Sequence, residues 1–336
     1  MSARAERIRC FLADAGWADV PRRPLAGDAS FRRYDRLEAA GRRAVLMDAP
    51  PPHEDVRPFL RIARLLKQLD LSAPEILAED IEAGLLLLED FGDRTYTRLL
   101  ADGGDEATLY RLAVDVLISL HHRFVPALGV GIPAYDDTRL LAEAALLVDW
   151  YLPAVSGTPT PPDLREEYLA TWRAMLPLAG AVAPTLVLRD YHVDNLMLLE
   201  GRRGLAACGL LDFQDAVIGS PAYDLVSLLE DARRDVSVAL ASALSEHYLA
   251  AFSGVDRAAF ATAAAVLAAQ RNCKILGIFT RLCVRDRKPQ YLAHTPRLWR
   301  LVERDVSHPA LAPVRRWLDR HIPAELRRIP AQEAAS

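Results

Sequence analysis

The sequence has little of what marks several broad classes of protein. Aromatic residues make up only 7% of the 336 residues, too few to favour the stacking platforms that bind single-stranded nucleic acids. The formal net charge of -4 lacks the basic excess of a dedicated nucleic-acid binder. No run of 18 uncharged apolar residues occurs. We therefore expect no nucleic-acid partner and no membrane span.

Cysteine is also scarce. The four cysteines form no CxxC pair and lie near no histidine of zinc-site spacing: Cys10, Cys208, Cys273 and Cys283. We expect buried free thiols, as in a reducing cytoplasm. Residues 1–7 lack the apolar core of a signal peptide, so the sequence predicts a cytoplasmic protein.

The apolar residues, 51% of the sequence, are numerous enough to form two hydrophobic cores. The length exceeds that of one ordinary domain, so two lobes are expected. The periodicity predicts an α+β protein with a β-rich lobe over residues 1–90 and a helical lobe over 91–336. The first lobe is expected to contain helices 5–15 and 55–69 and strands 31–37, 43–48, 76–80 and 85–89. The second is expected to contain helices 94–101, 105–124, 138–150 and 163–179, strands 186–188, 196–199 and 205–211, and helices after Pro221.

Two short polar segments carry the strongest functional signal. Asp190 follows a predicted strand, Asn195 comes five residues later, and Asp212 ends a short apolar strand. In phosphoryl transfer of the protein-kinase type, one carboxylate accepts the proton of the attacking hydroxyl, and an asparagine and a second aspartate bind magnesium on the ATP phosphates. The pattern predicts Asp190 as the catalytic base and Asn195 and Asp212 as magnesium ligands. His192 is predicted to orient the loop or to reach a phosphate.

Aspartate and asparagine are also common in ordinary turns, so either segment alone would fit a structural loop. The order of the two segments, the hairpin between them and the β-rich lobe before them favour a kinase. A pseudokinase without turnover would share most of this pattern.

These residues resemble the aminoglycoside phosphotransferase and choline kinase-like family, which shares the two-lobed protein-kinase fold. The catalytic loop of that family reads His-Gly-Asp, then four residues and Asn, whereas this chain has Leu188-Arg189-Asp190 and then Asn195. Asp212 matches the metal-binding aspartate of the family. The resemblance spans about residues 25–300 and implies ATP and magnesium as cofactors.

The segment Gly219–Leu225 also matches the family. The resemblance implies a structural role for Asp224, which is expected to tie the catalytic loop to a helix N-terminus.

The resemblance also places a nucleotide-binding turn at Gly27–Tyr34, although such a turn suits any hairpin. It includes Ser30, Phe31, Arg32 and Arg33, and its small residues would let backbone N–H groups approach phosphates. Met47 stands where the third strand normally offers a lysine to the phosphates. We expect either Arg32 or Arg33 to supply the missing cation, or magnesium to carry more of the charge.

Glu89 and Phe91 lie in the segment that resembles the connection between the lobes. Adenine is expected to bond to the backbone there, although a plain buried edge strand would have the same residue types.

Three further segments resemble the anomeric sugar kinases of bacterial cell-wall recycling: Leu46–Pro51, Leu188–His192 and Lys274–Leu282. This resemblance implies ATP-dependent phosphorylation of N-acetylmuramate or N-acetylglucosamine at the anomeric hydroxyl. A kinase for another small alcohol, of the aminoglycoside, choline or homoserine type, is an alternative, as is the pseudokinase. The sequence assigns no oligomeric state.

The segment 270–288 is strongly basic and has one acid, Asp286, against six cations: Arg271, Lys274, Arg281, Arg285, Arg287 and Lys288. Such a segment suits a substrate with a carboxylate, such as the lactyl group of N-acetylmuramate, although a solvated basic face would look the same. Asn272 and Arg281 are the candidate sugar contacts.

Overall fold

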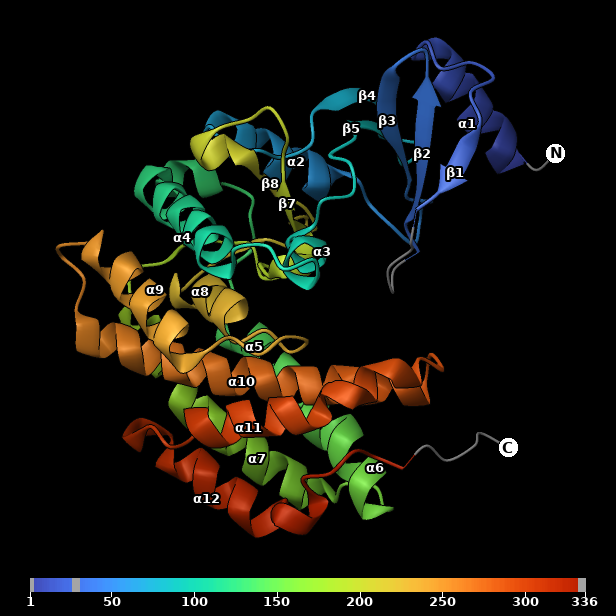
Figure 1. The fold of residues 1–336 in the computed structure, drawn as a ribbon. Helices are drawn as coiled ribbons and strands as arrows, with labels where there is room; N and C mark the ends of the chain where they lie inside the picture. Colours follow the sequence, from blue (N-terminus) through green and yellow to red (C-terminus); the bar gives the residue numbers. More distant parts are fainter. Residues whose placement is uncertain (1–2, 26–30, 332–336) are drawn as a thin grey trace. The chain divides into compact units, whose positions relative to one another are not determined.

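The computed structural model describes residues 3–25 and 31–331 (Figure 1). The chain forms two compact units. The first contains residues up to Val116 together with Val193–Ala216, and the second contains Leu117–His192 together with the residues from Val217 onward. The predicted α+β class, with a β-rich part followed by a helical remainder, is confirmed.

The first unit is built on an antiparallel sheet with the strand order β1-β2-β3-β5-β4. Its strands are β1 (Arg22–Pro24), β2 (Arg33–Ala39), β3 (Arg42–Asp48), β4 (Ile76–Asp80) and β5 (Leu85–Glu89). Ala40 and Gly41 both have positive φ, at 49° and 75°, which is typical of the two-residue turn that matches the strand twist. We did not predict β1, because its three exposed residues have no hydrophobic alternation.

One face of this sheet is covered by α1 (Ala3–Asp14), as Figure 1 shows. Ile8, Phe11 and Leu12 of this helix share a core with Leu37 and Leu46. Side chains alternate along a strand, so Tyr34, Arg36 and Met47 belong to the opposite face of the sheet.

The rest of the first unit holds two helices, most of a third and a hairpin. They are α2 (Arg57–Gln68), α3 (Tyr96–Ala101), the first part of α4 (Glu106–Arg123), and the strands β7 (Leu196–Leu198) and β8 (Cys208–Leu210). A side chain on Gly209 of β8 would come within 2.8 Å of the Phe91 ring, so only glycine allows this packing.

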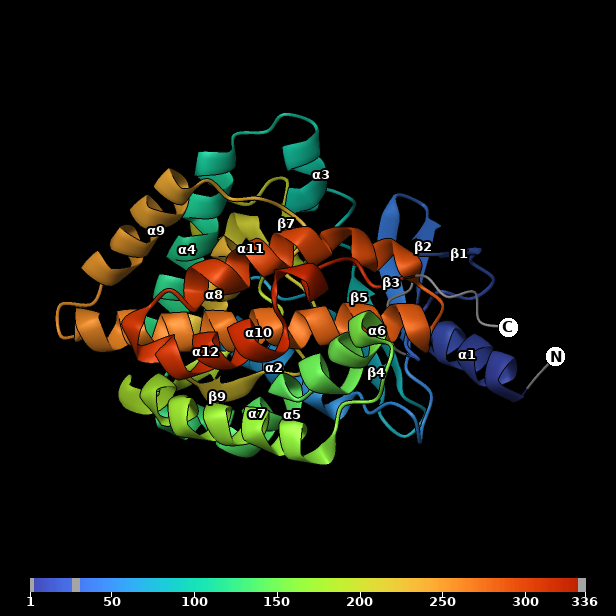
Figure 2. The same cartoon turned by 90° about the horizontal axis from the view of Figure 1, so that it is seen from below.

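The second unit is organised around the long helix α10 (Arg257–Val284), which crosses Figures 1 and 2. Asp256 caps its first turn by accepting hydrogen bonds from two backbone N–H groups. The other regular elements are α5 (Asp137–Ala144), α6 (Leu152–Ser156), α7 (Pro162–Met175), β6 (Thr185–Val187), β9 (Val217–Gly219), α8 (Ala222–Leu229), α9 (Val238–Ala250), α11 (Thr295–Asp305) and α12 (Ala312–His321). Helices α5, α8 and α11 pack against α10.

Several predicted boundaries were too generous. α5 ends at Ala144 and is followed by a π-helical turn over Leu147–Tyr151. α7 ends at Met175, shortly before Pro177, which has no N–H to continue the helix. Strand β9 was not predicted. Short 3₁₀ turns lie at Pro126–Gly129, Leu176–Ala181, Val193–Asn195, Gly204–Ala207, Pro289–His294, Pro309–Leu311 and Ala324–Leu326.

The cysteines are free thiols, as predicted, but the prediction that they are buried is only partly correct. Cys208 and Cys273 are buried, whereas Cys10 is exposed on α1. Among the described residues, none of the helices has the length and apolar character needed to cross a membrane.

Candidate active site

The predicted catalytic base lies in a loop of the second unit that is tied to α8. This loop runs from the end of β6 through Asp190. The carboxylate of Asp224, in the first turn of α8, accepts hydrogen bonds from the backbone N–H groups of Leu188 (2.6 Å) and Arg189 (2.9 Å). Burial raises the pKa of Asp224 to about 7. The predicted structural role of Asp224 is confirmed.

Arg189, directly before Asp190, has a left-handed backbone conformation with φ 69°. Such a conformation costs energy for a residue with a Cβ, and the glycine that the family normally has here would adopt it freely. The hydroxyl of Ser227 donates to the carbonyl of Arg189 at 3.2 Å. The guanidinium of Arg189 forms an ion pair with Glu143. These contacts hold the loop in a conformation that the sequence alone disfavours.

Glu143 on α5 is the centre of a buried charge cluster that sequence reasoning missed. Besides Arg189, it binds Lys274 Nζ of α10 at 2.9 Å and accepts a hydrogen bond from the Tyr135 hydroxyl. Burial alone would raise the pKa of Glu143, but Lys274 and Arg189 hold it below its ordinary value. Lys274 is therefore already paired with a carboxylate.

His192 is buried, with 7% of its surface exposed. Burial lowers the pKa of its imidazole, so the ring is neutral at neutral pH. A neutral buried ring suits the orienting role better than the neutralisation of a phosphate charge.

The two predicted magnesium ligands come together in the first unit. Asn195 directly precedes β7 and Asp212 follows β8, so the pairing of these strands brings their side chains to a separation of 3.4 Å between Nδ2 and Oδ2. The carbonyl of Asn195 also accepts a hydrogen bond from the Leu211 N–H. Gln214 donates to Asp212 Oδ1 at 2.8 Å.

The chemistry of this pair fits magnesium, which prefers hard oxygen ligands and retains waters and phosphate oxygens in its shell. One carboxylate and one amide oxygen would leave those positions to ATP. No cluster of three or more His, Cys, Asp or Glu side chains suited to a metal occurs within residues 3–25 and 31–331. The assignment of Asn195 and Asp212 as magnesium ligands therefore stays a prediction.

The predicted phosphate-binding turn is described in part, because Ser30 lies outside the described residues. Phe31 is 65% exposed and stacks on His53. Arg32 pairs with Glu54, with 3.7 Å between Nε and Oε2. Arg33 is paired with Asp48 in the sheet register, and so belongs to the face that α1 covers.

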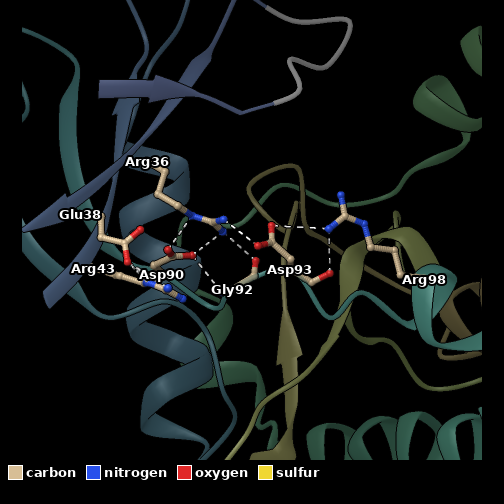
Figure 3. A network of polar contacts seen from close by, with 7 residues as sticks. All are labelled: Arg36, Glu38, Arg43, Asp90, Gly92, Asp93 and Arg98. Atoms are coloured by element: carbon tan, nitrogen blue, oxygen red, sulfur yellow. Dashed lines mark hydrogen bonds and ion pairs between the residues drawn. The ribbon is translucent and has the colours of Figure 1, made fainter. Parts of the chain in front are cut away.

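The segment after β5 is fixed by Arg36 of β2 (Figure 3). The buried guanidinium of Arg36 binds both carboxylate oxygens of Asp90, at 2.7 and 2.8 Å, and one oxygen of Asp93 at 2.8 Å. It also donates to the carbonyl of Gly92 at 2.9 Å. Although burial disfavours the charged form, Asp93 and Asp90 raise the pKa of Arg36. This network ties the segment that is predicted to bind adenine to strand β2.

Within that segment the two predicted adenine contacts differ. The N–H of Glu89 already donates to the carbonyl of Glu75 at 2.8 Å, and its carboxylate pairs with Arg202. The Phe91 ring packs on Gly209 and lies below the guanidinium of Arg202. These contacts favour the backbone near Phe91 over the Glu89 N–H as the place for adenine.

The candidate sugar contact Asn272 is fully buried inside the second unit. Its amide donates to Glu230 at 3.0 Å and to Asp305 at 2.9 Å. Burial raises the pKa of both carboxyls, so these two donated hydrogen bonds stabilise a costly pair of acids. This location favours a structural role for Asn272.

Arg281 is different, because it is partly exposed and pairs with no carboxylate among the residues that the structure describes. Partial burial and the nearby Arg285 lower the pKa of its guanidinium. A cation in this state would gain from a negatively charged ligand.

A match to the phosphotransferase enzyme family covers residues 21–261. The chain is 38% identical to the N-acetylmuramate/N-acetylglucosamine kinase of Caulobacter vibrioides, over 97% of this chain and 99% of that protein. The structure resembles a choline/ethanolamine kinase family protein from Mesorhizobium loti with a TM-score of 0.60 at 15% identity, over 96% of this chain and 99% of that one. An ADP-bound aminoglycoside phosphotransferase matches with a TM-score of 0.54 at 16% identity, over 90% and 97% of the two chains.

The fold is therefore the protein-kinase-like fold of small-molecule kinases, as predicted. The chain belongs to the phosphotransferase enzyme family.

Proposed function

We propose that this enzyme uses ATP and magnesium to phosphorylate the anomeric hydroxyl of N-acetylmuramate, N-acetylglucosamine or both, in the cytoplasm. The observation that carries the proposal is the 38% identity, nearly end to end, with a kinase named for these two sugars. The product is the sugar 1-phosphate, a substrate suited to a nucleotidyltransferase.

In the proposed reaction the anomeric oxygen attacks the γ-phosphorus of ATP, the bond to the β-γ bridging oxygen breaks, and ADP leaves. Asp190 accepts the hydroxyl proton. An anomeric hydroxyl is more acidic than an ordinary alcohol, so the demand on this base is modest. Asn195 and Asp212 would hold magnesium, which supplies neutralisation of the phosphate charge.

Arg281 is the residue that we assign to the carboxylate of N-acetylmuramate. The other buried cations of segment 270–288 already have partners. Lys274 pairs with the carboxylate of Glu143, and Arg271 donates to the carbonyl of Glu230. Arg281 remains as a partly buried guanidinium without a paired carboxylate among the described residues.

The proposed activity is tested with a panel of acceptors and labelled ATP. We expect N-acetylmuramate or N-acetylglucosamine to be phosphorylated, with an acid-labile product that is typical of a 1-phosphate, while aminoglycosides, choline and homoserine remain unmodified. Turnover of one of the latter instead would identify a different small-alcohol kinase. No turnover of any acceptor would favour the pseudokinase.

Replacing Arg281 with glutamine is expected to lower kcat/KM for N-acetylmuramate by about 10- to 100-fold, the loss that follows when a charged hydrogen bond of about 1.5–3 kcal/mol disappears. The value for N-acetylglucosamine, which lacks the carboxylate, should stay within about twofold. The matched control is Arg257→Gln at the other end of α10, where Arg257 pairs with the exposed Glu246. Equal losses for both sugars would exclude carboxylate recognition by Arg281.

A further inference from the structure

The first unit has no lysine that could take the place of the missing third-strand lysine. The whole sequence contains three lysines, Lys67, Lys274 and Lys288, and only Lys67 belongs to this unit. It lies in the last turn of α2 and is exposed. Met47 occupies the third-strand position with 1% of its surface exposed. If a side chain of this unit supplies the phosphate-binding cation, that side chain is therefore an arginine.

The candidate arginines near the start of β2 differ in their contacts. Arg36 shares the Met47 face, but two carboxylates and a carbonyl already bind its guanidinium. Arg33 lies opposite Asp48 on the face that α1 covers. Arg32 lies one residue before β2, and its guanidinium is near the carboxylate of Glu54.

Glu54 contacts both Phe31 and Arg32, in the described part of the predicted phosphate-binding turn. One carboxylate oxygen of Glu54 accepts the backbone N–H of Phe31 at 3.1 Å, and the other lies 3.7 Å from Arg32 Nε. Glu54 thus contacts both the backbone of Phe31 and the side chain of Arg32. Both partners of the ion pair are mostly buried, with 13% and 18% of their side chains exposed, so solvent screens the pair only in part.

We propose that the Arg32–Glu54 pair replaces the lysine–glutamate pair of other kinase-like enzymes. Arg32 binds the nucleotide phosphates, and Glu54 is the positioning residue. A guanidinium has five N–H donors, so one side chain can contact both a carboxylate and phosphate oxygens. The inference rests on the proposed function only in that the chain binds ATP.

The direct test compares two nucleotide probes by calorimetry, ADP with magnesium and adenosine. Arg32→Gln should weaken ADP binding by about 10-fold or more and leave adenosine binding within about twofold, because only ADP has phosphates. Arg32→Lys should recover part of the loss. Arg43→Gln, which breaks an exposed pair with Glu38 in the same sheet, is the control. Thermal unfolding confirms that each variant is folded.

Glu54 is tested by kinetics. Glu54→Gln should raise KM for ATP by about three- to tenfold with the sugar KM unchanged, and Glu54→Asp should restore part of the affinity. Normal ADP binding by Arg32→Gln, or an equal loss for adenosine, would overturn the proposal, as would a loss in Arg33→Gln alone. If the wild-type enzyme binds ADP and depends on Arg32 yet phosphorylates neither sugar, the proposed function fails and this inference stands.

Discussion

Replacing Asp190 with asparagine is expected to lower the rate of sugar phosphorylation by about 10²- to 10⁴-fold, the range that positioned acid–base groups contribute. An amide has nearly the size of the carboxylate but cannot accept the hydroxyl proton. The backbone hydrogen bonds from Leu188 and Arg189 to Asp224 do not involve the Asp190 side chain, so the loop should keep its conformation. Single-turnover rates with saturating ATP and sugar provide the measurement.

The matched control is Asp149→Asn, which removes the charge of an aspartate in the same unit that pairs with Arg165 at 2.7 Å. It should keep the wild-type rate. Binding of ADP and the unfolding midpoint should be unchanged in Asp190→Asn. Full activity of that variant would remove Asp190 from the mechanism.

Replacing Asp212 with asparagine should have a comparable effect for a different reason. Loss of the charged magnesium ligand removes several kcal/mol of charge stabilisation at the phosphates, which corresponds to about a 10²- to 10³-fold decrease in kcat/KM. Asp212 has a positive φ of 58°, and asparagine is one of the few residues that tolerate this conformation. The substitution therefore isolates the charge from backbone strain.

The specific readout for Asp212→Asn is a magnesium titration, in which the half-saturating concentration should rise well above that of the wild type. Asp105→Asn serves as the control, since asparagine can still cap the first turn of α4 where Asp105 accepts the Thr108 N–H. An unchanged magnesium requirement in Asp212→Asn would show that this carboxylate does not bind the metal.

Much of the fold could be read from local patterns. The strands β4 and β5 were predicted with their observed limits, because Leu85–Leu88 form a short apolar run that the turn ending at Gly84 bounds. The meeting of Asn195 and Asp212 also followed from local structure, since one hairpin separates them. The strand β1 was not predicted because Arg22–Pro24 has no hydrophobic pattern, and β9 was not predicted either.

The ion pairs around the site could not be predicted in this way. Arg36 pairs with Asp90 and Asp93, which lie 54 and 57 residues later in the sequence. Arg189 pairs with Glu143, which lies 46 residues earlier. The sequence contains many arginines and many acidic residues, and nothing local distinguishes the pairs that form. Only the packing of the chain determines which arginine meets which acid.

The sequence by itself determined the local arrangement of the candidate site, because a carboxylate after a strand and an asparagine–aspartate pair across a hairpin are set by short-range spacing. The tertiary structure decided which residues are available for that chemistry. It placed Asn272 among buried carboxylates, paired Lys274 with Glu143, and paired Arg32 with Glu54. Burial and pairing depend on neighbours that are distant in the chain, and no local pattern encodes them.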